Sequence, residues 1–280
     1  MPKRDVTAGE ILCTYIKRNL FDANAWSELS SSLYSTGRGE QWSEFVEEVV
    51  ATQLACRFVT AGSSIAESLG GKKCVGELLF RQEMRSITTE TMACSLDRKI
   101  RARLDDLIER AVLATYGSVS DADKMLLRAE VGKRPRCYLC NSFLELRLDS
   151  VLFPTDEQKK RVIEYEHVWP RAFGGDTIID NLALSCHDCN NRKASYANWS
   201  MVDIQSLVLA HNPSDESLAK IPGLRRFAML SYAAHRIADK GSLSLKSAHL
   251  RLQHEVITPK LRRTTDVADF FNLINYSETV

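Results

Sequence analysis

Two Cys-x-x-Cys pairs constrain this sequence more than any other feature. Cys137 and Cys140 form the first pair, and Cys186 and Cys189 form the second. Zinc binds four thiolates at the corners of a tetrahedron, and a tight turn with cysteines at positions i and i+3 supplies two of them. The pairs therefore predict a structural Zn²⁺ site that joins two distant parts of the chain. Because four protein ligands leave no open position, this zinc is expected to stabilise the fold and not to react.

A disulfide framework is the alternative for these cysteines. The N-terminus has early charges but no long apolar stretch followed by a small-residue cleavage site, so we expect a cytoplasmic protein. In that compartment paired cysteines favour a metal over disulfides. No run approaches the roughly 18 consecutive apolar residues of a membrane span, and we expect no membrane association. The remaining cysteines stand among apolar helical residues and are predicted to be buried small hydrophobes: Cys13, Cys56, Cys74 and Cys94.

The predicted fold class is mainly α, with a small α+β (ββα-metal) core and helical N-terminal and C-terminal extensions. We expect a helical N-terminal domain over residues 1–130, a zinc-stapled domain over 131–200 and a helical extension over 201–280. An apolar stripe at spacings of three and four predicts a helix over 96–112. Ser120, with Asp123 three residues later, predicts the start of the next helix.

The region around the cysteine pairs has strand patterns in addition to helical ones. Residues 143–149 alternate apolar and polar side chains, and 161–168 are rich in β-branched and aromatic residues, so both predict strands. A helix is expected from about 189 to 199. Further on, Pro222 is placed in the first turn of a helix that ends at Gly241.

The stretch EYEHVWPRAFGGDTIIDNLALSCHDCNNRK contains the residues that carry chemistry. It resembles the HNH nuclease motif, the ββα-metal site, in its zinc-stapled form. The matching features are, in order, Glu166-His167, Pro170, the loop 174–176, the triplet 180–182 and the segment 186–193. The resemblance covers roughly residues 133–200 and does not extend to the helical flanks.

The resemblance implies a role for each of four residues. His167 is the general base, Glu166 and Asn190 hold a catalytic divalent cation such as Mg²⁺, and Asn181 braces the loop and orients the histidine. Many family members carry His where Asn190 stands, so this chain is an H-N-N variant. The chemistry agrees, because Mg²⁺ prefers oxygen ligands and an imidazole accepts protons near neutral pH.

Three further residues have competing interpretations. Lys193 and Arg171 are candidate phosphate contacts, with a solvated surface charge as the equal alternative. His187 lies inside the second cysteine pair, where the motif does not place its last ligand, and it is given no role.

The function that follows is a metal-dependent HNH endonuclease acting on nucleic acid, with double-stranded DNA favoured over RNA. A net charge of +1 permits this but does not identify it. The resemblance also suggests an effector of bacterial anti-phage defence that acts with an ATPase or sensor subunit through its helical flanks. The alternatives are a zinc-stabilised nucleic-acid-binding or scaffold module without cleavage activity, and an HNH nuclease for RNA such as tRNA. The Glu166-His167 pair favours the enzyme, since a degenerate nuclease has no reason to keep its base.

Overall fold

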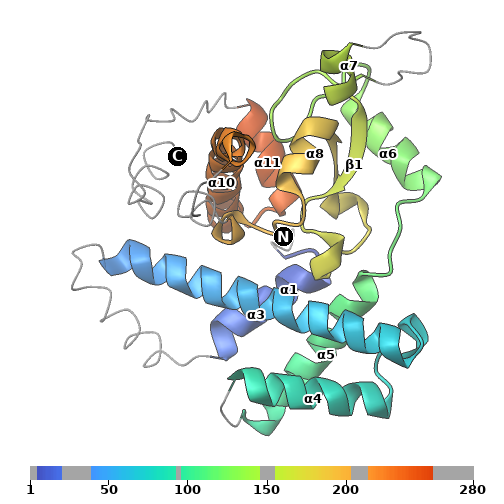
Figure 1. Cartoon of the computed structure of the whole chain (residues 1–280), viewed down its shortest axis with the longest axis vertical. Helices are drawn as coiled ribbons and strands as arrows, with labels where there is room; N and C mark the ends of the chain where they lie inside the picture. Colours follow the sequence, from blue (N-terminus) through green and yellow to red (C-terminus); the bar gives the residue numbers. More distant parts are fainter. Residues whose placement is uncertain (1–4, 21–38, 93–95, 146–154, 203–213, 255–280) are drawn as a thin grey trace. The chain divides into compact units, whose positions relative to one another are not determined.

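The computed structural model describes residues 5–20, 39–92, 96–145, 155–202 and 214–254 (Figure 1). The chain divides into two compact units. One comprises Asp5–Ser118 together with Trp169–Thr177, and the other comprises Val119–Val168 and Ile178–Val280 with the first four residues. We call them the helical unit and the zinc unit. The predicted three-domain boundaries stay a prediction.

The helical unit is built from α1 (Ala8–Asn19), α3 (Gly39–Leu69), α4 (Leu78–Met92) and α5 (Arg98–Ala114), with a short 3₁₀ turn at Lys72–Cys74. Asp97 caps α5 by accepting hydrogen bonds from the backbone N–H groups of Lys99 and Ile100. The predicted stripe on this helix is buried at Leu104, Leu107, Ile108, Ala111 and Val112. Hydrophobic burial along this stripe therefore holds the helices together.

Within α3, the segment Glu47–Leu69 is long and apolar enough to cross a membrane. Length and composition give only weak support for a span, because the core helix of a soluble protein meets the same criteria. Phe58 and Val59 in this segment are fully buried against the rest of the helical unit, as a core helix requires.

The loop Trp169–Thr177 belongs to the helical unit, where it packs on α1 and α5 through glycines. The backbone N–H of Gly9 donates to the carbonyl of Gly174 at 2.8 Å. A Cβ on Gly9 would lie 2.1 Å from the Phe173 carbonyl oxygen, and Gly174 has φ +81°. Only glycine fits both positions. Asp176 adds a hydrogen bond, accepting from the N–H of Ala8 at 2.6 Å.

The zinc unit contains one β-hairpin and the helices around it. The strands β1 (Ile163–His167) and β2 (Leu182–Cys186) pair antiparallel, from Ile163↔Cys186 to His167↔Leu182. The helix α8 (His187–Lys193) follows β2 directly and lies beside β1 (Figure 1). The other helices are α6 (Asp121–Val131), α7 (Asp156–Lys160), α10 (Asp215–Gly241) and α11 (Leu245–His254).

Several predicted elements are confirmed and others are not. The mainly helical fold with a hairpin and helix is present, β1 lies within the strand predicted over 161–168, and Ser120 caps α6 with Asp123 as expected. The helix predicted from about 189 to 199 is present but its bounds are wrong: α8 spans His187–Lys193 and is followed by Ala194, where φ is +45°. The strand predicted over 143–149 forms only isolated bridges, at Phe143 and Glu145. Its residues 146–149 lie outside the described part of the chain.

The prediction for Pro222 is also wrong. The helix α10 begins at Asp215 and continues through Pro222 to Gly241. A proline favours the first turn because it has no N–H to donate, but tertiary packing can tolerate the one missing helical hydrogen bond. From Leu224 to Ala238 the helix buries most of its side chains, with Tyr232 packed edge-on against Trp199. Burial of this long face of α10 outweighs the preference of proline for the first turn of a helix.

Candidate active site and zinc site

The four paired cysteines converge on one point. The Sγ atoms of Cys137, Cys140, Cys186 and Cys189 all lie within 4.8 Å of one another. Cys140 Sγ and Cys186 Sγ are 3.8 Å apart, and all four thiols are free. A Zn–S bond of about 2.3 Å places two tetrahedral ligands about 3.8 Å apart. The spacing therefore fits zinc and is far longer than the roughly 2.05 Å of a disulfide bond.

Local structure prepares these thiols for a metal. In the first turn Asn141 adopts φ +60° and donates its N–H to the carbonyl of Cys137 at 2.9 Å, while Cys186 is the N-cap of α8. The four thiols share hydrogen bonds, which lower the pKa of Cys140 and Cys186 and raise that of Cys137 and Cys189, so two of the four give up their protons more readily than the others. Since zinc binds thiolates, metal binding would displace the remaining thiol protons of the cluster.

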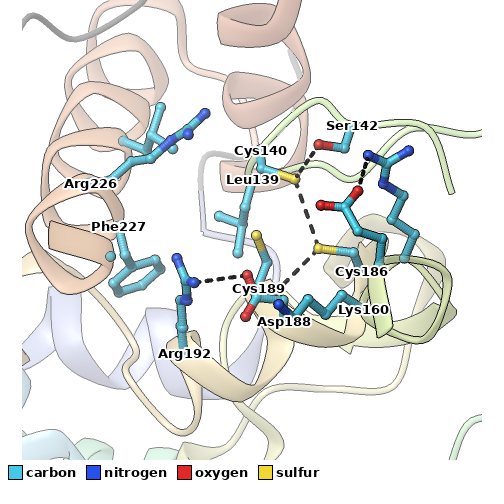
Figure 2. A pocket seen from close by; sticks show the side chains of 14 residues that line it. Leu139, Cys140, Ser142, Lys160, Cys186, Asp188, Cys189, Arg192, Arg226 and Phe227 are labelled. Atoms are coloured by element: carbon cyan, nitrogen blue, oxygen red, sulfur yellow. Dashed lines mark hydrogen bonds and ion pairs between the residues drawn. The ribbon is translucent and has the colours of Figure 1, made fainter. Parts of the chain in front are cut away.

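A pocket of about 270 Å³ lies beside this cluster (Figure 2). Figure 2 shows Cys140, Cys186 and Cys189 on one side and Arg226 and Phe227 of α10 on the other. The pocket is lined by the carboxylates of Glu157 and Asp188 and by four basic side chains, those of Lys160, Arg161, Arg192 and Arg226. Four thiolates around one zinc ion carry a net negative charge, and these cations offset it.

The catalytic candidates lie on the hairpin and on α8. Glu164 and Glu166 are two residues apart on β1, so they point to the same face of the hairpin, the face on which α8 packs. The pairing continues without a bulge to His167, so Glu166 and His167 leave the strand toward opposite faces. Both side chains are half-buried.

Lys193 lies against Glu166. Its Nζ donates to Glu166 Oε1 at 2.6 Å and to the backbone carbonyl of His167 at 2.9 Å. The lysine side chain is 2% exposed and the Glu166 side chain 14%. Burial raises the pKa of Glu166 and lowers that of Lys193, and each partner opposes the shift of the other. Lys193 thus connects α8 to the end of β1, and a phosphate contact by Lys193 stays a prediction.

Replacing Lys193 with methionine is expected to lower the free energy of unfolding by about 3–5 kcal/mol, because the partner carboxylate stays buried without a counter-ion. Urea denaturation of the zinc-loaded protein measures this. The control is Arg192→Met, which breaks the exposed ion pair between Arg192 and Asp188 and should cost no more than about 1 kcal/mol. Equal losses in the two variants would contradict the structural role of Lys193.

Asn190 contacts the carboxylate of Glu164, the neighbour of Glu166 on the same face of β1. The side-chain amide of Asn190 donates to Glu164 Oε2 at 3.0 Å. The other oxygen of Glu164 lies 2.6 Å from Nδ1 of His187. Neither Glu164 nor His187 was a predicted site residue. The alternation of β1 contained a usable indication, since Glu164 must share the face of Glu166.

Asn181 lies where it can brace the end of β1. Its backbone carbonyl accepts a hydrogen bond from the N–H of Val168 at 2.8 Å, and the residue is 2% exposed. Val168 follows His167 directly, so this bond fixes the chain immediately after the histidine. Arg171 belongs to the helical unit, is exposed, and donates to the carbonyl of Gly117 at 3.0 Å. A phosphate contact by Arg171 stays a prediction.

Both oxygens of Glu164 have hydrogen-bond partners, so the candidate metal donors on the face shared by β1 and α8 are the carboxylate of Glu166 and the amide oxygen of Asn190. These are hard oxygen donors, which suit Mg²⁺ or Mn²⁺ better than the softer metals that thiolates select. The ammonium of Lys193 contacts Oε1 of Glu166, so a cation at this face would share the Glu166 carboxylate with it. The residues therefore fit a second metal of a different kind from the one that the four cysteines select.

Comparison with known proteins gives one match. A family model described as HNH endonuclease matches residues 155–199, which include β1, β2, α8 and the second cysteine pair. Comparison with curated proteins and with solved structures gave no match.

Proposed function

Since residues 155–199 form an HNH endonuclease domain, we propose that this chain is a metal-dependent endonuclease that hydrolyses phosphodiester bonds in double-stranded DNA. One observation carries the proposal: β1 and α8 bring Glu166 and Asn190 to one face, while the cysteine cluster fixes the start of α8. Asn190 follows Cys189 directly, so a zinc ion held by the cysteines also fixes the position of Asn190.

In the proposed reaction the scissile phosphate lies at the end of β1, within reach of both faces of the hairpin, and His167, the last residue of the strand, takes a proton from the attacking water. The water oxygen bonds to phosphorus, the bond to the 3′ oxygen breaks, and that oxygen takes a proton from a solvent water, while His167 returns its proton to solvent. The products are a 5′-phosphate and a 3′-hydroxyl. Asn181 holds the backbone after His167, and Glu166 and Asn190 would hold the divalent cation. When bound, such a cation neutralises the phosphate oxygens and stabilises the leaving oxygen.

Purified zinc-loaded protein incubated with supercoiled plasmid is expected to nick or linearise it with Mg²⁺ and to leave it intact with EDTA. Gel electrophoresis measures the products. Single-stranded DNA and tRNA, tested in parallel, decide between DNA and RNA. Binding without cutting on every substrate would favour the alternative, a zinc-stabilised nucleic-acid-binding module.

A role in anti-phage defence, with an ATPase or sensor subunit bound to the helical flanks, stays a prediction from the resemblance alone. Cytoplasmic location is likewise a prediction.

A further inference from the structure

A chain of side-chain contacts crosses from α8 to β1 and returns to α8. Asn191 Nδ2 lies 2.9 Å from His187 Nε2, His187 Nδ1 lies 2.6 Å from Glu164 Oε1, and Asn190 Nδ2 donates to Glu164 Oε2 at 3.0 Å. Glu164 therefore uses one oxygen for His187 and the other for Asn190. All four residues lie in the zinc unit.

The protons in this chain follow from the chemistry of each group. An ionised carboxylate only accepts hydrogen bonds, and an amide has one accepting end and one donating end. The end of Asn190 that faces Glu164 must therefore be the NH₂ group, and Oδ1 is at the other end. Because Asn191 donates to Nε2 of His187, the ring proton lies on Nδ1 and is donated to Glu164.

We propose that Glu164, supported by His187, is a positioning residue that turns Asn190 so that Oδ1 is the atom presented to the catalytic cation. This inference rests on the proposed function. An amide binds a cation only through its oxygen, and a rotated Asn190 would present its N–H donors instead. A carboxylate at this position would not need a partner to set its orientation in this way, because both of its oxygens can bind a cation.

Glu164 acts through Asn190 and is not itself a ligand. Both of its oxygens have hydrogen-bond partners, and its side chain is 32% exposed, whereas that of Glu166 is 14% exposed. Loss of a partner that orients a metal ligand weakens metal binding by roughly 10–100-fold. We expect a loss of this size for Glu164→Ala.

The first test measures Mn²⁺ affinity of the full-length zinc-loaded protein without nucleic acid, using electron paramagnetic resonance of free Mn²⁺. Glu164→Ala is expected to bind roughly 10–100-fold more weakly than the wild type. His187→Ala, at a half-exposed position, is expected to show a smaller loss and keeps the test usable if Glu164→Ala folds poorly. The matched control is Asp188→Asn, which removes a negative charge paired with Arg192 and should change affinity by less than about two-fold.

The second test separates positioning from direct ligation by repeating Glu164→Ala in an Asn190→Asp background. Aspartate offers two equivalent oxygens and needs no orientation, and it would repel Glu164. There, Glu164→Ala is expected to leave Mn²⁺ affinity unchanged or to raise it. Equal weakening in both backgrounds would overturn the proposal and make Glu164 a ligand. His187→Ala should show the same dependence on background.

Glu166→Ala distinguishes failure of this inference from failure of the proposed function. If Glu166→Ala weakens Mn²⁺ binding and Glu164→Ala does not, the positioning role alone is overturned. If Glu166→Ala leaves the affinity unchanged, the proposed cation site is overturned, and the positioning role with it.

Discussion

Cys137→Ser is expected to remove zinc from the protein and to unfold the zinc unit. Apparent binding free energies of structural zinc are about 10–16 kcal/mol, comparable to the roughly 5–15 kcal/mol that stabilises a whole domain. The cluster links the turn at Cys137 and Cys140 to the start of α8, so its loss releases both. Zinc content by atomic absorption and thermal unfolding by circular dichroism measure the effect.

The matched control is Cys74→Ser, because Cys74 lies outside the cluster and donates from Sγ to the carbonyl of Leu69 at 2.9 Å. A serine hydroxyl can make the same bond, so zinc content and unfolding should stay as in the wild type. A Cys137→Ser protein that folds normally without zinc would refute the structural site.

His167→Ala is expected to lower the rate of plasmid cleavage by about 10²–10⁴-fold, the usual contribution of a general base. Zinc content should not change, because His167 is not one of the four cysteine ligands, and two backbone bonds that hold this part of the chain do not involve its side chain. The carbonyl of His167 accepts from Lys193, and the N–H of Val168 donates to Asn181. Both bonds survive the substitution.

Chemical rescue separates a lost base from a disturbed site. Imidazole added to the assay should restore part of the activity of His167→Ala and none of the activity of Glu166→Ala, since only the first variant lacks a proton acceptor. Cleavage by His167→Ala at the wild-type rate would rule out the proposed mechanism.

Several features of the site can be predicted because they depend on local spacing. Cysteines at i and i+3 can share a metal whatever surrounds them, and the two pairs converge as their spacing predicts. Strand alternation puts Glu164 and Glu166 on one face, and the β-branched and aromatic stretch forms β1. The same kind of pattern predicts the capped start of α6 and the buried stripe of α5.

Other features depend on residues that are distant in the sequence. From the sequence, Lys193 is equally compatible with a solvated surface charge and with a phosphate contact. Only the packing of α8 on β1 buries it against Glu166. His187 acquires a partner because the hairpin register brings Glu164 beside the first residue of α8. Pro222 lies inside a helix because a long buried face outweighs one missing hydrogen bond.

The sequence by itself thus determined which atoms are present: four thiolates for zinc, and a histidine, carboxylates and amides in the order of an HNH motif. Tertiary structure decided how those atoms are used, pairing Lys193 with Glu166 and Asn190 with Glu164. The physical reason is that ligand type and local spacing are written into neighbouring residues. Burial and hydrogen-bond partners, in contrast, exist only once β1 and α8 have packed together.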